Sequence, residues 1–149
     1  MPKASVKRLI DCKKEQLIDL VLDIEKYPEF VPFCLGSKIY EKKDKDDQLL
    51  IIADLTIGKG PFKETYKSDV KFNKNEDSIY VTNLDGPLKH LENNWHFKEI
   101  NNLSEVSFEI DFELKNDFLN IIMTKSFQFG LNKIADAFQK RAEELFSKA

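Results

Sequence analysis

Few side chains in this sequence have the type and spacing that chemistry requires, and Glu64 and Tyr66 come nearest. Both fall on the strand face that also carries Phe62 and Val70, because strand side chains alternate between two faces. A carboxylate and a phenol on an otherwise apolar face could act as an acid/base pair in a cavity. Solvated or hydrogen-bonded side chains near the rim of a cavity explain them equally well, and we favour this interpretation because an unpaired buried carboxylate is costly.

Other catalytic motifs are missing. Gly58-Lys59-Gly60-Pro61 is too short for a phosphate-binding loop, and no Gly-x-Ser-x-Gly sequence occurs. Two cysteines and two histidines without metal-ligand spacing argue against a zinc site, so we predict no metal and no catalytic residue. His90 and His96 fall on the strand face opposite Trp95, and we interpret them as surface residues.

Length and charge limit the class of protein. A chain of 149 residues buries roughly two-thirds of its unfolded surface, which suffices for a core, and we predict a single domain over residues 1–149. The net charge is -3 although 33% of the residues are charged. This balance gives no overall basic surface, so we expect no DNA partner.

Nothing in the sequence marks secretion or membrane insertion. The N-terminus leads into no apolar signal segment, and no run approaches the roughly 18 apolar residues that a membrane span needs. We therefore expect a cytoplasmic protein in which Cys12 and Cys34 are free thiols. Any membrane contact should be peripheral, on the inner face of the membrane.

Alternation of apolar and polar residues predicts a series of antiparallel strands. The predicted strands are 4–10, 36–41, 49–57, 62–72, 78–84, a strand through Trp95, and 105–114. The connections between them are expected at the charged segment 42–47, at 58–61, at 73–77, at Asp85-Gly86-Pro87 and at Ile100-Asn101-Asn102.

Two helices are expected from apolar residues at helical spacing. The first covers 13–23 and is followed by a short helix or turn in the aromatic segment 27–34, which two prolines interrupt. That segment could cover the core, gate a ligand or touch a membrane. The second runs from a possible N-cap at Asn116 to about residue 147, with an apolar stripe ending in Ala142 and Leu145. Such a helix would be roughly 48 Å long, so we expect a bend or an independent segment at 121–130.

This order predicts an α+β fold. A curved antiparallel sheet of about seven strands would wrap around the long C-terminal helix, with one or two short helices after the first strand. In the hairpin that turns at Asp85-Gly86-Pro87, the apolar face of the second strand carries Leu91, Asn93, Trp95 and Phe97. We expect this face to line a space between the sheet and the helix, filled either by side chains or by a ligand.

Four segments together carry a resemblance to a known family. They are 27–34 (YPEFVPFC), 85–91 (DGPLKHL) leading to Trp95-His96-Phe97, 106–114 (VSFEIDFEL) and 137–142 (AFQKRA). In this order they resemble the coenzyme Q-binding START-like family, which includes mitochondrial coenzyme Q chaperones and bacterial RatA ribosome-association proteins within the polyketide cyclase/dehydrase and lipid-transport superfamily. Leu88 departs from the Phe of many relatives. The resemblance implies a helix-grip fold with an apolar cavity.

The first functional hypothesis is a non-catalytic carrier or chaperone of a hydrophobic small molecule. The resemblance implies ubiquinone or a similar isoprenoid lipid as the ligand, in support of respiratory electron transport. Glu64, Tyr66 and Asn93 are the candidates for orienting a polar head, and the segment 30–33 could open against a membrane surface. The predicted cavity residues are Phe30, Val31, Phe33, Leu55, Phe62, Glu64, Tyr66, Leu91, Asn93, Trp95, Phe97, Phe108, Ile110, Phe112, Phe127, Leu131 and Ile134.

Two alternatives stay open. The resemblance also implies a RatA-type regulator that binds the large ribosomal subunit and blocks subunit joining. The row Lys63, Lys67 and Lys71 could then contact RNA phosphates, although Asp69 lies within it. A cyclase-like enzyme is the weaker alternative, because no convincing acid/base set is present.

Overall fold

A computed structural model describes the backbone of residues 3–59, 62–85, 88–115 and 117–146. Within these ranges it describes all side chains except those of residues 59, 62, 85, 88, 114 and 117–127. The predicted N-cap Asn116, the tip of the turn at Gly86 and Pro87, and the side chains of Phe62 and Phe127 therefore lie outside the described residues.

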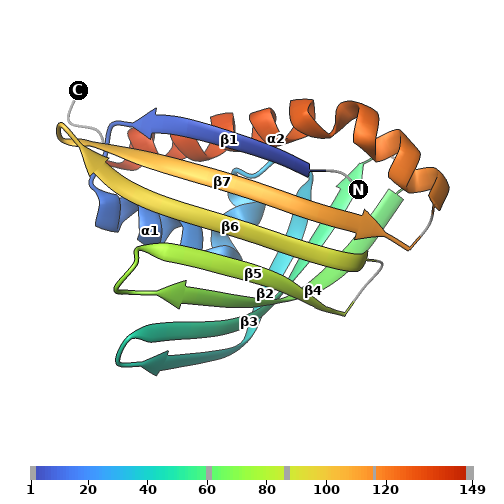
Figure 1. Cartoon of the computed structure of the whole chain (residues 1–149), viewed down its shortest axis with the longest axis horizontal. Helices are drawn as coiled ribbons and strands as arrows, with labels where there is room; N and C mark the ends of the chain where they lie inside the picture. The colour runs from blue at the N-terminus through green and yellow to red at the C-terminus, as the bar shows by residue number, and fades with distance from the viewer. Residues whose placement is uncertain (1–2, 60–61, 86–87, 116, 147–149) are drawn as a thin grey trace.

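One antiparallel sheet of seven strands forms the body of the molecule (Figure 1). The strands are β1 (Lys3–Ile10), β2 (Cys34–Lys45), β3 (Gln48–Lys59), β4 (Phe62–Asn73), β5 (Ser78–Asp85), β6 (Leu88–Ile100) and β7 (Leu103–Leu114). Their spatial order is β1-β7-β6-β5-β4-β3-β2, so β2 to β7 form a meander and β1 adds to its far edge beside β7. The predicted fold class is confirmed.

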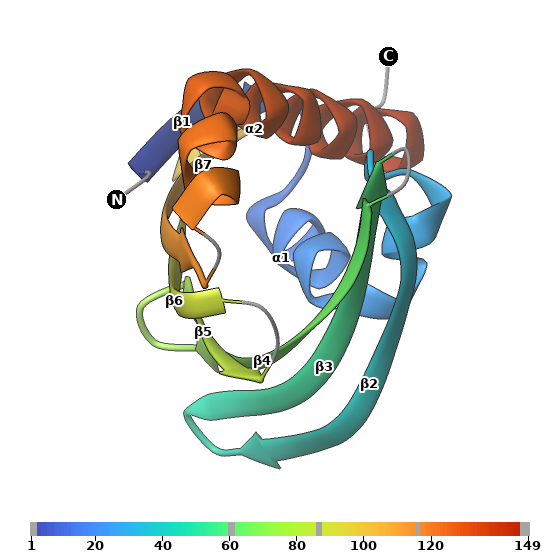
Figure 2. The ribbon, with the colours of Figure 1, turned by 90° about the vertical axis from the view of Figure 1, so that its right-hand side faces the viewer.

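The sheet curves strongly around its contents, as Figure 2 shows. Register shifts interrupt the pairing of β2 with β3 at two places, of β4 with β5 beside Ser68, and of β6 with β7 near Leu88. Bulges of this kind bend a strand and increase its twist. Curvature gives the sheet a concave face, which must be covered by other elements because its side chains are apolar.

The hairpin between β6 and β7 is as tight as the sequence predicted. Asn101 and Asn102 both have positive φ angles, 51° and 69°, between the paired residues Ile100 and Leu103. Two left-handed residues make the type of turn whose twist matches that of the flanking strands, and Asn tolerates this conformation better than most residues. This turn fixes the register that places Trp95 opposite Phe108.

The helix α1 (Lys14–Leu22) lies inside the curve of the sheet (Figure 2). Its N-terminus is capped by Gln16, whose side-chain Oε1 accepts a hydrogen bond from the Lys13 N–H at 3.0 Å. Five of its nine residues are buried, and the fully buried Leu17 contributes to the same core as Ile51 and Ile79 of the sheet. A short 3₁₀ helix, η1 (Ile24–Glu29), follows; it begins before the predicted segment 27–34 and contains only the first of the two prolines, Pro28.

The helix α2 (Asp117–Phe146) runs across the open side of the curve as one helix, and its N-terminal part is bent relative to the rest (Figure 2). Of the two outcomes expected around 121–130, the helix thus shows a bend and no separate segment. Leu131, Phe138 and Ala142 are buried, but Leu145, which the predicted stripe included, is 53% exposed. The apolar stripe continues beyond Ala142 at Phe146 instead, which is half-buried and packs against the core.

The prediction of a charged turn over 42–47 is wrong in its extent. Lys42 to Lys45 belong to β2 and pair with Ile51 to Gln48 of β3, so only Asp46 and Asp47 form the turn. A run of charges here is compatible with a strand because β2 is an edge strand and its residues 41–45 are all exposed.

Substitution of the buried Ile51 on β3 should strongly destabilise the fold. Ile51 is fully buried, so Ile51→Ala should lower the free energy of unfolding by about 2–5 kcal/mol through lost burial and a residual cavity. Urea-induced unfolding followed by circular dichroism measures this. Leu35→Ala is the control: Leu35 is 59% exposed, so the change should stay within about 0.5 kcal/mol. Equal effects of the two substitutions would contradict the assigned core.

Candidate functional site

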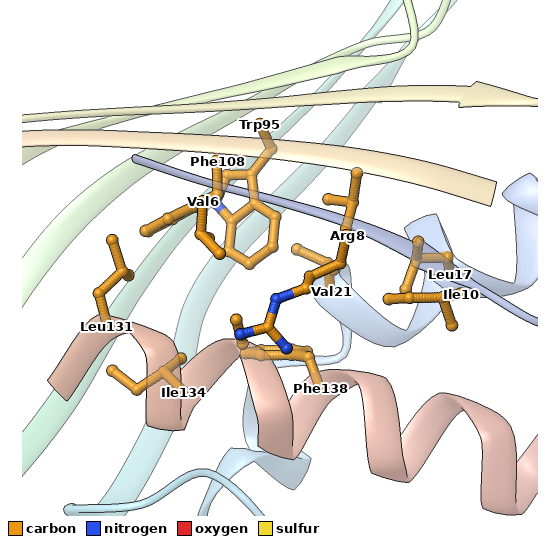
Figure 3. Close-up of a pocket in the computed structure, with 12 residues that line it drawn as sticks. Val6, Arg8, Ile10, Leu17, Val21, Trp95, Phe108, Leu131, Ile134 and Phe138 are labelled. Atoms are coloured by element: carbon orange, nitrogen blue, oxygen red, sulfur yellow. The ribbon is translucent and has the colours of Figure 1, made fainter. Parts of the chain in front are cut away.

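A small apolar cavity lies where α2 and α1 meet the concave face of the sheet (Figure 3). Its volume is about 20 Å³. The residues that line it are Val6, Arg8, Ile10, Leu17, Val21, Trp95, Val106, Phe108, Leu131, Ile134, Ala135 and Phe138. This volume holds little more than one water molecule, so side chains fill most of the space between the sheet and the helix.

An aromatic cluster forms one wall of the cavity. The ring centroid of Trp95 lies 4.4 Å from that of Phe108 and 5.5 Å from that of Phe138, both in edge-to-face arrangements. Phe138 in turn lies 5.4 Å from Tyr27 and 5.1 Å from Phe30. These contacts join the sheet, α2 and the aromatic segment that follows α1 into one continuous packing unit.

Among the described residues that line the cavity, Arg8 alone carries a charge. It lies on the inward face of β1, between Val6 and Ile10, and its guanidinium reaches toward α2 beside Phe138 (Figure 3). The Nη1 atom donates to Asp136 Oδ1 at 2.6 Å and to Gln139 Oε1 at 3.3 Å. The side chain is 24% exposed, whereas that of Asp136 is 67% exposed. Arg8 therefore spans the distance between the cavity and solvent.

Polar contacts hold α2 along the whole edge strand β1. The Gln128 side-chain amide donates to the Ser5 carbonyl at 3.1 Å, and that of Gln139 donates to the Leu9 carbonyl at 3.3 Å. Glu143 accepts a hydrogen bond from the Asp11 backbone N–H. We call this row, with the Arg8 contacts, the β1–α2 seam. It satisfies backbone groups of an edge strand that has a neighbor on one side only.

Four of the residues predicted for a cavity come together in this one: Trp95, Phe108, Leu131 and Ile134. Others lie in the packed interior around it. Phe97 and Phe112 are buried, whereas Phe30, Val31, Leu55, Leu91 and Ile110 are half-buried. Phe33 is also half-buried, with a positive φ of 70°, and its carbonyl accepts a hydrogen bond from the Gly58 N–H.

The polar residues predicted to orient a ligand do not line the cavity. Glu64 is exposed, and Tyr66 is half-buried; burial, with a smaller contribution from Glu64, raises the pKa of the Tyr66 phenol. Asn93 is half-buried, and its Oδ1 is buried without a hydrogen-bond partner among the described residues. This orphan acceptor makes Asn93 the only one of the three with an unmet polar group inside the fold.

β1 and α1 contribute residues to this cavity that the sequence did not indicate. Ala4, Val6 and Ile10 share the inward face with Arg8, so alternation along β1 was the available signal for Arg8. Leu17 and Val21 lie in the segment 13–23, whose apolar spacing predicts a helix but does not indicate which part of the sheet that helix contacts.

The predicted lysine row lies on the convex face, away from the cavity. Lys63 and Lys71 are exposed, and Lys67 is half-buried with its Nζ 5.0 Å from the ring center of Tyr40. Lys38, on β2, approaches the same ring at 4.9 Å. The Tyr40 hydroxyl donates to Asp54. Lys38, Lys63, Lys67 and Lys71 together form what we call the lysine face, which Asp54 and Asp69 partly neutralise.

The two thiols are free, as predicted, and both are buried. Burial raises the pKa of Cys12 and that of Cys34, so both stay protonated and unreactive near neutral pH. Across the described residues, no group of three or more potential ligands could hold a metal ion. In the same part of the chain, no helix combines the length and the hydropathy needed to cross a bilayer.

Comparison with family models gives a match over residues 10–139 to the family described as polyketide cyclase / dehydrase and lipid transport. The ribosome association toxin RatA of Rickettsia prowazekii is 28% identical over 141 residues, covering 93% of this chain and 94% of that protein. RatA of Escherichia coli is 29% identical over 148 residues, covering 99% and 90%. The mitochondrial coenzyme Q-binding protein COQ10 of Dictyostelium discoideum is 33% identical over 138 residues, covering 90% and 65%.

Solved structures agree with the fold. An 18 kDa protein from Caulobacter crescentus superposes with a TM-score of 0.81 at 28% identity, covering 97% of this chain and 98% of that one. An aromatase/cyclase from a Streptomyces species reaches the same TM-score at 12% identity, covering 95% and 93%. At that identity the second likeness concerns the fold alone.

Removing the indole should test the aromatic wall. Trp95→Ala should lower the free energy of unfolding by about 3–5 kcal/mol, because Trp95 contacts Phe97, Phe108 and Phe138. Circular dichroism during urea unfolding measures this without the lost fluorophore. Trp95→Phe keeps a ring and should cost less. Added indole should raise the Tm of the Ala variant more than that of the wild type, and an equal response would contradict a packed cavity at this position.

Proposed function

This chain belongs to the polyketide cyclase/dehydrase and lipid transport family, and we propose that it acts as a RatA-type protein that binds the large ribosomal subunit. The observation that carries this proposal is the similarity to RatA proteins over nearly the full length of both chains. As a regulator of this type, it would block the joining of the ribosomal subunits.

The lysine face supplies the chemistry for this contact. Ribosomal RNA presents phosphates, and lysines that neutralise them release counterions, which favors binding at low salt. The chain as a whole has a net charge of -3, so attraction to RNA must come from a local surface. Four lysines face two aspartates here, and the stacking of Lys38 and Lys67 against Tyr40 holds two of the charges in place.

Reversing these charges should abolish the association. The variant with Lys63→Glu, Lys67→Glu and Lys71→Glu should no longer co-sediment with the large subunit, whereas the wild type should do so at low salt and progressively less as salt rises. Sucrose-gradient sedimentation with purified subunits measures this. The control variant carries Lys3→Glu, Lys7→Glu and Lys98→Glu, the same change of charge at exposed positions on the other half of the sheet. Failure of the wild type to co-sediment would contradict the function, and equal loss in both variants would contradict the surface.

A second candidate function is the binding of ubiquinone or a similar isoprenoid lipid in the cavity. It is favored by the apolar lining and by the similarity to COQ10. Burial of an isoprenoid tail would contribute about 25 cal/mol per Å² of apolar area, so the tail would dominate the affinity. The cavity of about 20 Å³ must then expand, which requires α2 to move relative to the sheet. The segment 30–33 would be the contact with a membrane surface.

We propose no catalytic activity for this cavity. Among the described residues, its lining has no carboxylate, histidine, thiol or hydroxyl group, and the one ionisable side chain among them is that of Arg8, which stays protonated. Neither an acid/base pair nor a nucleophile is therefore available there.

Lipid binding should be visible in the purified protein. Extraction with organic solvent followed by mass spectrometry should recover an isoprenoid lipid in a roughly one-to-one ratio with the protein. Ile134→Gln, which places an amide in the cavity wall, should lower this ratio severalfold, whereas Leu145→Gln on the exposed side of α2 should leave it unchanged. A wild-type extract without lipid would contradict this second function and leave the ribosomal proposal intact.

A further inference from the structure

We infer that Arg8 recognises the polar end of the apolar ligand, and that this end carries oxygen atoms that accept hydrogen bonds, as a carboxylate or a carbonyl does. This inference rests on the second candidate function, the binding of an apolar molecule in the cavity. It assigns to Arg8 the orienting role for which Glu64, Tyr66 and Asn93 were the candidates from sequence.

The position of Arg8 in the strand is the first observation. Ala4 and Ile10 on the same inward face are buried and Val6 is half-buried, so a charged residue breaks an apolar row. A guanidinium beside apolar side chains loses hydration, and this loss must be offset by acceptors. Figure 3 shows it against Phe138, with Trp95 and Val21 nearby. A strand facing only a filled core would gain stability from an apolar residue at this position.

The protein partners of Arg8 engage only some of its N–H donors, and the side chain is 24% exposed, so water or a ligand can reach the others. Both hydrogen bonds use Nη1, and within the described part of the chain no hydrogen bond from Nε or Nη2 is found. A guanidinium has five N–H donors in a planar fork that suits a carboxylate. The ion pair with Asp136 involves a carboxylate that is 67% exposed, and pairs of this kind contribute little to stability. A ligand oxygen can therefore replace or join Asp136 at low cost.

The surroundings define the rest of the ligand. From Arg8 the cavity continues to Leu131, Ile134 and Phe108, all of them apolar, so the body of the ligand must be apolar too. Arg8 itself is part of the β1–α2 seam, beside solvent-exposed Asp136. The polar end of the ligand would thus lie at the seam and the apolar body toward the interior. A group with donors only would be rejected, because arginine offers no acceptor.

Three fluorescent probes distinguish recognition of the polar end of a ligand from burial of its apolar body. cis-Parinaric acid ends in a carboxylate, its methyl ester ends in a neutral carbonyl, and diphenylhexatriene has no polar end. All three should quench the emission of Trp95, the only tryptophan and a cavity residue, when they bind. Arg8→Met should weaken the binding of parinaric acid about tenfold or more, the usual range for a lost charge-assisted hydrogen bond, and leave diphenylhexatriene nearly unchanged.

Matched variants distinguish recognition from a structural role. Arg141→Met also removes an arginine that pairs with a carboxylate, Glu29 at 2.8 Å, but Arg141 does not line the cavity, so binding should not change. Asp136→Asn removes the competing carboxylate and should strengthen the binding of parinaric acid severalfold, which loss of a merely structural ion pair would not do. Arg8→Lys keeps the charge without the fork and should restore part of the affinity.

The results of these titrations test the role of Arg8 and the binding of an apolar ligand separately. A tenfold preference of the wild type for the acid over the ester identifies an anionic end, and equal affinities that both depend on Arg8 identify a neutral carbonyl; either result supports the inference. If Arg8→Met binds all three probes as the wild type does, the inference is wrong and cavity binding stands. If the wild type binds none of the probes, the second candidate function fails, and the inference fails with it.

Discussion

The packing of the Phe138 ring holds the long helix against the sheet, and the rest of the structure depends on it. This one ring, 5% exposed, meets Tyr27 and Phe30 on one side and Trp95 on the other. It thereby fastens α2 to the aromatic segment after α1 and to the middle of the sheet at once. The apolar concave face of a curved sheet must be buried by another element. Here α2 buries it, and Phe138 makes the central contact between α2 and that face.

The two sides of α2 are held by different forces. Toward the concave face the helix is packed through Leu131, Phe138 and Ala142, which are buried. Toward β1 it is also held by hydrogen bonds and by the ion pair of Arg8 with the exposed Asp136, each of which contributes little. Leu131 adds apolar packing against Ala4 and Val6 of the same strand. The β1–α2 seam therefore combines an apolar inner side with a polar outer side.

Sequence alone predicted the fold because its signals were local and consistent. Strand alternation, the Asn101-Asn102 turn and the stripe on α2 each follow from contacts within one element or between neighbors in the chain. Arg8 could not be assigned in this way, since its role depends on β1 lying beside β7 and beneath α2. Glu64 shows the limit of the same signal: alternation assigns it to the face of the buried Val70, yet its side chain is exposed, in agreement with the solvated interpretation. Alternation assigns a residue to one face of the sheet but does not indicate how deeply its side chain is buried.

The pairing of β1 with β7 also limits how the chain can fold during synthesis. Lys3 pairs with Asp111, and Arg8 binds Asp136, so the first strand finds its partners only after most of the chain has left the ribosome. Until then its apolar inward residues and its open edge have no native neighbor. Closing such a long loop is entropically unfavorable, so β1 should dock late, onto a meander that has already formed. The contacts of the β1–α2 seam should thus be the last part of the fold to form.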